Sequence, residues 1–169
     1  VDDPAAPLAS LAVVVVAGDA VIDESYWGRR TIDAADPQRS LPVTPATKFR
    51  VASLSKVATA IGAMQLVEEG KLDLDADIGK YLGFTLRNPA YPERPITTRM
   101  LLSHTSSLRD AGFYNLPFPY TLRDLFVPGG VYYAHGAHFG GPQEGGDRGP
   151  GAFFTYANLN YGVLATVME

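Results

Sequence analysis

The strand-forming residues of this chain are concentrated near its beginning, and this uneven distribution restricts the folds that the chain can adopt. Two β-rich runs in LAVVVVAGDAVIDESYWG, residues 11–28, flank Gly18-Asp19 and predict a β-hairpin. The first run is apolar throughout, which is typical of a strand covered on both faces. No strand signal of this kind follows the first 30 residues. Because a lone hairpin is only marginally stable in water, we expect it to belong to a sheet whose other strands come from elsewhere.

Helical and irregular segments make up the rest of the predicted structure. Residues 28–48 hold charges and prolines and are expected to form a long surface connection. A helix is predicted from Ser53 to Glu69, with Gly70 at its C-terminal end. Its apolar side chains recur at helical spacing: Val57, Ala60, Ile61, Met64 and Val67. Shorter helices are expected within LDLDADIGKYL, after a capping threonine in ITTRMLLSHTSSL, within TLRDLF, and in the final YANLNYGVLATVME.

The composition indicates a folded globular chain and excludes several classes of protein. Of the 169 residues, 46% are hydrophobic and 19% are charged. The net charge of −4, without a patch rich in lysine and arginine, argues against nucleic-acid binding. No apolar run approaches the roughly 20 residues of a membrane-spanning helix. The absence of cysteine excludes disulfides and thiolate zinc sites.

A long segment rich in glycine, proline and aromatic residues, from Asp110 to Gly151, allows two interpretations. Its aromatic side chains either line a substrate cleft or pack beneath a long loop: Phe113, Tyr114, Phe118, Tyr120, Tyr132 and Tyr133. His135 and His138 also lie there, in a stretch without the helix that would make spaced histidines a metal site. We expect a flexible loop at these histidines, and neither a metal nor a cofactor.

Ser53 and Lys56 open the longest predicted helix and are the first candidates for chemistry. Residues at positions i and i+3 share one face of a helix, so Lys56 Nζ can approach Ser53 Oγ. Serine is a poor nucleophile until a base removes its proton, and a lysine amine can be that base in a partly dry pocket. An N-cap serine beside an exposed lysine is the simpler interpretation, and for an isolated S-x-x-K motif it is the favoured one.

Three segments of the sequence, taken together and in their order along the chain, favour the catalytic interpretation of Ser53 and Lys56. TPATKFRVASLSK resembles the nucleophile segment of the penicillin-recognising serine hydrolases, the superfamily of class C β-lactamases, D,D-peptidases and related esterases. ITTRMLLSHTSSL resembles that family's I-T-x-R-x-L-L-x-H-T-S-G-L segment, with Ser107 where glycine is usual. His104 in this segment is expected to have a structural, hydrogen-bonding role. PGAFFTYANLNYGVLATVME resembles the segment with the Y-x-N motif, here Tyr156-Ala157-Asn158.

The resemblance implies an α+β fold of the β-lactamase and penicillin-binding-protein type, with a catalytic group of four residues. Ser53 would be the acylated nucleophile and Lys56 its general-base partner. Tyr156 would be a proton shuttle, and Asn158 would bind the lysine and the substrate. Whether the lysine or the tyrosine takes the first proton stays open. Taken singly, Tyr156 could be an ordinary core or surface aromatic residue, and Asn158 could be a helix cap.

The family's third motif, a K-T-G-like or H-x-G-like triad on a later strand, has no match in this chain. In the family, that strand also supplies the second N–H of the oxyanion hole, the first being the N–H of Ser53. The resemblance therefore implies one partial domain over residues 1–169, with strands and a connection in residues 1–52 and the nucleophile helix and loops in residues 53–169. We expect a fragment whose hairpin edge pairs with the C-terminal half of the same protein or with a second copy, and which alone lacks appreciable activity.

Two functions from different classes are open. The first is a serine hydrolase that forms an acyl-enzyme on an amide or ester substrate, and the sequence does not distinguish a β-lactam, a D-amino-acid peptide and a small ester. The second is a catalytically silent fragment or interaction module of the same fold. The family favours a periplasmic or secreted location, although the opening VDDPAAP lacks the features of a signal peptide.

Overall fold

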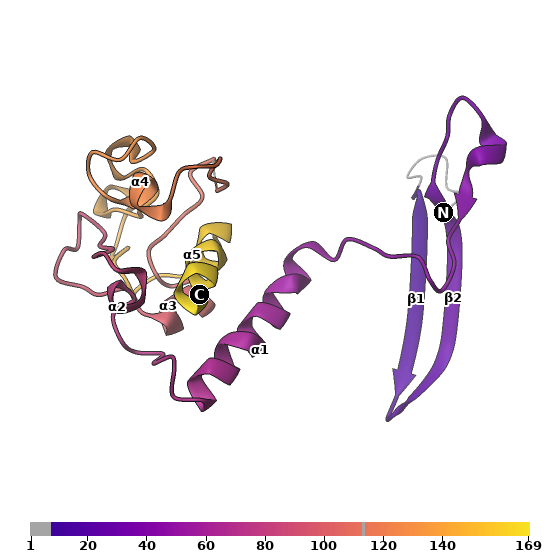
Figure 1. The fold of residues 1–169 in the computed structure, drawn as a ribbon, viewed down its shortest axis with the longest axis horizontal. Coiled ribbons are helices and arrows are strands. Elements are labelled where there is room, and N and C mark those ends of the chain that lie inside the picture. The colour runs from indigo at the N-terminus through magenta and orange to yellow at the C-terminus, as the bar shows by residue number, and fades with distance from the viewer. Residues whose placement is uncertain (1–7, 113) are drawn as a thin grey trace. The chain divides into compact units, whose positions relative to one another are not determined.

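The predicted hairpin is present in the structure, a computed structural model that describes residues 8–112 and 114–169 (Figure 1). β1 (Ser10–Ala17) and β2 (Ala20–Thr31) pair antiparallel across a two-residue turn. Gly18 in this turn has a φ of +59°, a backbone conformation that glycine adopts without the strain a side chain would add. The turn chemistry read from the sequence therefore sets the register of the two strands.

A third strand extends the sheet, so the prediction of a plain surface connection over residues 28–48 is wrong in part. β3 (Leu41–Pro42) pairs antiparallel with β2, which gives the strand order β1-β2-β3. Between β2 and β3 the chain forms a short 3-10 helix, η1 (Pro37–Arg39), and the Ser40 hydroxyl accepts a hydrogen bond from the Asp33 N–H. Because β3 is two residues long and includes a proline, it has no alternating pattern that the sequence could reveal.

β1 forms one edge of the sheet, and its valine side chains stay exposed within the compact unit that ends at Val51. Val14 is 51% exposed and Val16 is 62% exposed. Among the described residues of this unit, Val43 is the one buried hydrophobic side chain. The unit itself therefore does not supply the cover that the sequence predicts for this strand. The predicted pairing of the edge with another polypeptide stays a prediction.

Ala52–Glu169 forms a second compact unit, which is helical. It starts with a single 3-10 turn, η2 (Ala52–Leu54), that leads directly into α1 (Ser55–Glu68). Gly70, with a φ of +69°, follows the end of this helix as predicted. The long helix expected from the sequence is therefore confirmed, with the difference that its first turn is the tighter 3-10 form.

Four further α-helices follow in the described residues, each in a segment where the sequence predicts a helix. They are α2 (Gly79–Leu82), α3 (Thr98–Leu102), α4 (Leu122–Phe126) and α5 (Asn158–Met168). α3 has the expected threonine cap, since the hydroxyl of Thr97 accepts a hydrogen bond from the N–H of Met100. Between α4 and α5 the helical structure consists of single 3-10 turns, η3 (Ala134–Gly136) and η4 (Pro142–Glu144).

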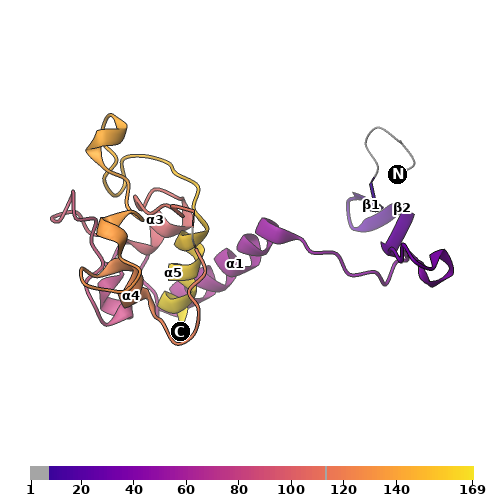
Figure 2. The same cartoon turned by 90° about the horizontal axis from the view of Figure 1, so that it is seen from above.

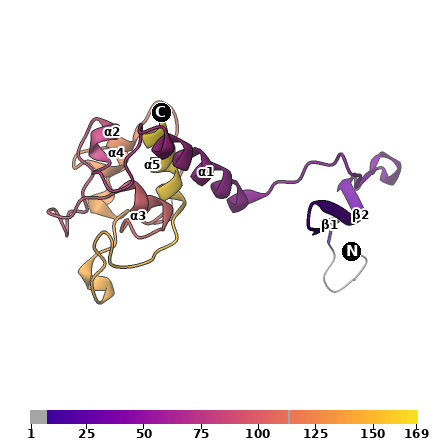
Figure 3. The same cartoon turned by 90° about the horizontal axis from the view of Figure 1, so that it is seen from below.

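The core of this second unit forms around α5, which packs against α1, α2 and α3 (Figures 2 and 3). Val163 and Leu164 of α5 are fully buried there. The buried core residues are Ala63, Leu72, Ile78, Leu86, Ile96, Leu101, Leu108, Leu125, Phe126, Phe139, Leu159, Val163, Leu164 and Val167. This packing holds the start of α5, which carries Asn158, firmly against the rest of the unit.

The side of α1 that packs against this core overlaps only in part with the side that the spacing of apolar residues predicts. Ala63 is buried and Val67 packs against the core, whereas Val57 and Ile61 are 60% and 58% exposed. α1 carries apolar residues on more than one side, and periodicity alone does not identify which side is covered in such a helix.

Candidate active site

The four residues that the sequence proposes for catalysis lie within hydrogen-bonding distance of one another. Ser53 comes from η2, Lys56 from the first turn of α1, and Tyr156 and Asn158 from the start of α5 and the residues just before it. Ser53 Oγ lies 2.6 Å from the hydroxyl oxygen of Tyr156, which is 103 positions away in the chain. Lys56 Nζ lies 3.1 Å from Ser53 Oγ, 2.8 Å from the Tyr156 hydroxyl and 2.8 Å from Asn158 Oδ1.

The side chain of Ser53 is directed into this cluster and does not cap α1. The residue at the N-cap position of α1 is Leu54, and no side chain bonds to the helix there. Ala52, directly before the serine, has a φ of +45°, which costs a residue with a side chain about 1–2 kcal/mol. The interpretation of Ser53 as an N-cap beside an exposed lysine is therefore wrong.

The ammonium group of Lys56 donates its hydrogen bonds to the other three residues of this cluster. An ammonium group has three N–H donors and no acceptor, and three side-chain oxygens lie within hydrogen-bonding distance of Nζ. Because Lys56 donates to both hydroxyl oxygens, the hydroxyl proton of Ser53 is free to point at the oxygen of Tyr156. Either hydroxyl can donate in this contact, and when the serine donates, its acceptor within the cluster is the phenol oxygen.

The pKa of Tyr156 lies below its ordinary value of 10.0. The hydrogen bond from Lys56 lowers this pKa most, and the hydrogen bond with Ser53 lowers it further. Partial desolvation and the negative charge of Asp110 act in the opposite direction. Lys56 Nζ also lies 5.0 Å from the centre of the Tyr156 ring. Because its pKa is lowered, this phenol ionises more readily than a free tyrosine, and once ionised it can accept the serine proton.

The ring of His104 packs against the ring of Tyr156. The two ring centres lie 4.5 Å apart, and His104 Nδ1 accepts a hydrogen bond from the N–H of Ala157 at 3.3 Å. Burial lowers the pKa of His104, and the charge of Lys56 lowers it further, so the neutral ring that can accept this bond is favoured. The structural role expected for His104 is confirmed.

A serine in the turn after α3 and an asparagine of α5 form a buried polar pair that the sequence did not single out. Ser106 donates a hydrogen bond to Asn160 Oδ1, and Asn160 Nδ2 lies 3.0 Å from His104 Nδ1. Ser106 and Asn160 are both fully buried. Ser107, at the position where the family usually has glycine, has a φ of +68°, the left-handed conformation that glycine adopts most easily. Its hydroxyl accepts a hydrogen bond from Asn88 Nδ2.

Asp110 is a second residue that sequence reasoning missed. Its carboxylate accepts hydrogen bonds from the backbone N–H groups of Asn158 and Leu159, both at 3.0 Å, and from Asn158 Nδ2 at 2.9 Å. Asp110 therefore caps α5, and the alternative that Asn158 is the cap is wrong. The only trace in the sequence is an aspartate two positions after LLSHTSSL, and no local pattern links it to a helix 48 positions away.

A groove of about 420 Å³ opens beside Ser53. Its lining residues are Ala52, Ser53, Ser55, Lys56, Thr59, Tyr114, Asn158 and Tyr161. Of the aromatic residues expected either to line a cleft or to pack under the loop, Tyr114 lies at this groove, whereas Tyr132 and Tyr133 pack against the core. Phe118 is almost fully exposed, and Phe113 lies outside the described residues.

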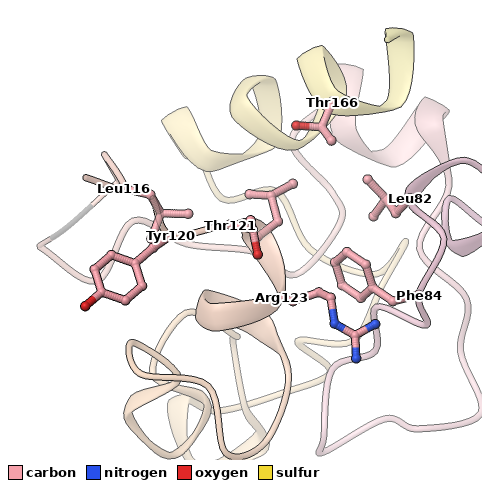
Figure 4. A pocket seen from close by; sticks show the side chains of 8 residues that line it. Leu82, Phe84, Leu116, Tyr120, Thr121, Arg123 and Thr166 are labelled. Atoms are coloured by element: carbon pink, nitrogen blue, oxygen red, sulfur yellow. The ribbon is translucent and has the colours of Figure 1, made fainter. Parts of the chain in front are cut away.

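A separate pocket of about 490 Å³ lies between α4, the end of α2 and α5 (Figure 4). Leu82 and Phe84 form one side, Thr121 and Arg123 another, and Thr166 of α5 faces them. It shares no lining residue with the groove at Ser53. The Thr121 hydroxyl donates to the carboxylate of Asp124 within the capping box of α4, and no pair like Ser53 and Lys56 occurs among the described residues that line this pocket. The groove at Ser53 is therefore the better candidate for an active site.

Neither a metal centre nor a membrane-spanning helix is found in the described part of the chain. No group of three or more histidine, cysteine, aspartate or glutamate residues is placed there to hold a metal ion. His135 has a φ of +54°, and buried His138 has its Nδ1 3.3 Å from the carbonyl oxygen of Arg109. No helix in residues 8–112 and 114–169 has both the length and the apolar character needed to cross a membrane.

Comparison with known proteins agrees with the resemblance read from the motifs. A family model described as Beta-lactamase matches residues 4–169. The human serine beta-lactamase-like protein LACTB, mitochondrial, is 34% identical over 102 residues, which cover 56% of this chain and 17% of that protein. EstCE1, described as a hydrolase with promiscuous acyltransferase activity, superposes with a TM-score of 0.64 at 25% identity, over 94% of this chain and 40% of that one.

A penicillin binding protein from Bacillus halodurans has the same fold over the same share of this chain. It superposes with a TM-score of 0.59 at 27% identity and covers 94% of this chain and 43% of its own. The chain thus spans less than half the length of each of these three proteins. The fold predicted from the sequence, that of the β-lactamases and penicillin-binding proteins in part, is confirmed.

Proposed function

The chain belongs to the beta-lactamase family, a family of serine hydrolases, and we propose that Ser53 attacks amide or ester carbonyl groups to form an acyl-enzyme. The observation that carries this proposal is the 2.6 Å contact between Ser53 Oγ and the Tyr156 hydroxyl, with Lys56 Nζ bonded to both oxygens. A nucleophile, a base within reach and a third group that orients the base are the parts that nucleophilic catalysis requires.

In the proposed reaction, Tyr156 acts as the base in its ionised form. Its oxygen takes the hydroxyl proton of Ser53 while Oγ forms a bond to the carbonyl carbon of the substrate. The tetrahedral species then collapses, the bond to the leaving nitrogen or oxygen breaks, and Tyr156 returns the proton to the leaving group. Water that enters the groove hydrolyses the ester on Ser53 by the same proton route in reverse.

Lys56 and Asn158 have supporting roles in this proposal. The ammonium of Lys56 stabilises the phenolate, because a charge-assisted hydrogen bond at 2.8 Å favours the anion. Asn158 holds Lys56 through its Oδ1 and leaves its side chain at the wall of the groove, where a substrate amide would lie. The substrate class is an amide or ester that is small enough to reach Ser53 along this groove.

Labelling with a fluorophosphonate probe tests the proposal. Ser53, Lys56 and Tyr156 lie in residues 52–169, and the family resemblance implies that a later strand supplies the second N–H of the oxyanion hole. We therefore expect the protein, with that strand present, to be labelled once, at Ser53, by peptide mapping. Ser53→Ala should abolish labelling with little effect on folding. Ser103→Ala is the matched control, because the Ser103 hydroxyl is occupied by the Arg99 carbonyl oxygen and should not affect labelling. Label on another serine, or none at all, would overturn the proposal and favour a silent interaction module.

A further inference from the structure

Asn158 can hold Lys56 only when the oxygen of its side-chain amide, and not the NH₂ group, faces the lysine. Its Oδ1 accepts a hydrogen bond from Lys56 Nζ at 2.8 Å. If the amide rotated by half a turn, its NH₂ group would face the ammonium, and two donors would oppose each other. The orientation seen in the structure therefore needs a partner that accepts from Nδ2 and cannot donate.

Asp110 is that partner. Its Oδ2 accepts from Asn158 Nδ2 at 2.9 Å, and an ionised carboxylate has acceptors only. The carboxylate is itself fixed by the first turn of α5, through Oδ2 to the N–H of Asn158 and Oδ1 to the N–H of Leu159. A half-buried carboxylate held by two backbone donors at a helix N-terminus has little freedom to move.

We infer that Asp110 is a positioning residue, which sets the amide of Asn158 so that its oxygen holds Lys56 against Ser53 and Tyr156. This inference rests on the proposed acylation at Ser53 for its effect on rate, but the orientation of Asn158 is measurable without any reaction. The chain of contacts runs from the loop after α3, through α5, to the start of α1. The negative charge of Asp110 also counteracts the effect of Lys56 on the pKa values of Tyr156 and His104.

The first experiment is a double-mutant cycle on the rate of fluorophosphonate labelling. In Asp110→Asn, an NH₂ group takes the place of one carboxylate oxygen and opposes either Asn158 Nδ2 or a backbone N–H. We expect labelling to slow by about 10-fold to 100-fold, since small displacements of catalytic groups have effects of this order. In an Asn158→Ala background the same change should slow labelling by less than about twofold, because Asp110 acts through that amide. Equal effects in both backgrounds would overturn the inference.

The second experiment needs no activity and separates this inference from the proposed function. Hydrogen exchange of the Asn158 side-chain NH₂ group, followed by NMR, should be slow in the wild-type chain and clearly faster in Asp110→Asn. Unchanged exchange would overturn the inference even if Ser53 is labelled. If Ser53 is not labelled in the wild-type protein with the second oxyanion-hole donor present, the proposed function fails, and the exchange measurement alone decides the role of Asp110.

Asp124→Asn is the matched control for both experiments. Asp124 is also a carboxylate at the first turn of a helix, where it accepts from the N–H and the hydroxyl of Thr121. Its loss should weaken the cap of α4 but leave both the labelling rate and the exchange of Asn158 as in the wild type. A general effect of removing any capping carboxylate would appear in this variant too, and would contradict a specific role for Asp110.

Discussion

The two units of the chain differ in how far their apolar side chains are buried. In residues 52–169, side chains such as Leu86, Ile96 and Leu164 are fully buried around α5. In residues 8–51, which include the sheet of β1, β2 and β3, the valines of β1 are between 37% and 62% exposed, and Val43 is the one buried hydrophobic residue. All four proposed catalytic residues belong to the unit that has the core.

The difference shows where precise geometry can be maintained. The contacts among Ser53, Lys56, Tyr156 and Asn158 have to hold to a few tenths of an ångström, and close packing around α5 provides that rigidity. An exposed sheet face of this kind is stabilised only by whatever covers it. Each unit contains a tyrosine, a lysine, a leucine and a glycine that can be compared with a residue of the same type in the other unit. Substitutions in these pairs therefore test the difference between the two units.

The largest expected effect is a loss of labelling rate in the Tyr156→Phe variant. Loss of the proposed base should slow fluorophosphonate labelling of Ser53 by about 10²–10⁴-fold, the usual contribution of a general base. The wild-type rate should rise with pH as the phenolate forms, with a midpoint below the ordinary value of about 10, because Lys56 and Ser53 lower the pKa of Tyr156. This rising limb should be absent in the variant.

Tyr26→Phe is the control from the sheet, where the Tyr26 hydroxyl bonds to Glu24 Oε2 on an exposed surface. It should label at the wild-type rate with an unchanged pH profile. A Tyr156→Phe variant that is labelled as fast as the wild type would place the base elsewhere and break the assignment of chemistry to this cluster.

The next effect concerns Lys56, for which two substitutions separate charge from proton transfer. Lys56→Met should lose most labelling, whereas Lys56→Arg should be about tenfold faster than Lys56→Met, since a hydrogen bond to a charged group contributes about 1.5–3 kcal/mol. Arginine keeps its charge but cannot serve as a base. Equal rates in the two variants would mean that Lys56 itself takes the proton. Lys48→Met, in the other unit, should be labelled like the wild type.

A third prediction compares buried and exposed leucine. Leu164→Ala should lower the free energy of unfolding by about 2–5 kcal/mol, because it leaves a cavity in the core around α5. Leu41→Ala should change it by less than about 0.5 kcal/mol, since Leu41 is 42% exposed on β3. Urea unfolding followed by circular dichroism would measure both. A large loss for Leu41→Ala would show that the sheet face is covered in solution.

The smallest effects are expected at two glycines that both have open space around them. A Cβ atom on Gly18 or on Gly162 would meet nothing within 4 Å, so only the backbone conformation distinguishes the two positions. Gly162→Ala in α5 should stabilise the chain by about 1 kcal/mol, since alanine favours a helix over glycine. Gly18→Ala should destabilise the hairpin by about 1 kcal/mol, because its φ is +59°. Shifts of the same sign in thermal unfolding would contradict this account.

The sequence alone determined the features that depend on neighbouring residues. The hairpin follows from the turn at Gly18, α3 from the threonine cap at Thr97, and the proximity of Ser53 to Lys56 from the spacing of one helical turn. Tyr156 and Asn158 were identified by the resemblance of their segment to a known family. Each of these signals is local, because a turn, a cap or an i, i+3 pair is encoded within a few positions.

Only the tertiary structure decided the features that join distant parts of the chain. Asp110 meets Asn158 across 48 positions, and the Nδ1 of His104 meets Asn160 across 56. The covered side of α1 and the pairing of the short strand β3 also depend on what lies opposite them. The physical reason is that a polar side chain shows its partner only after packing has brought the two together, whereas backbone preferences act before the chain has folded.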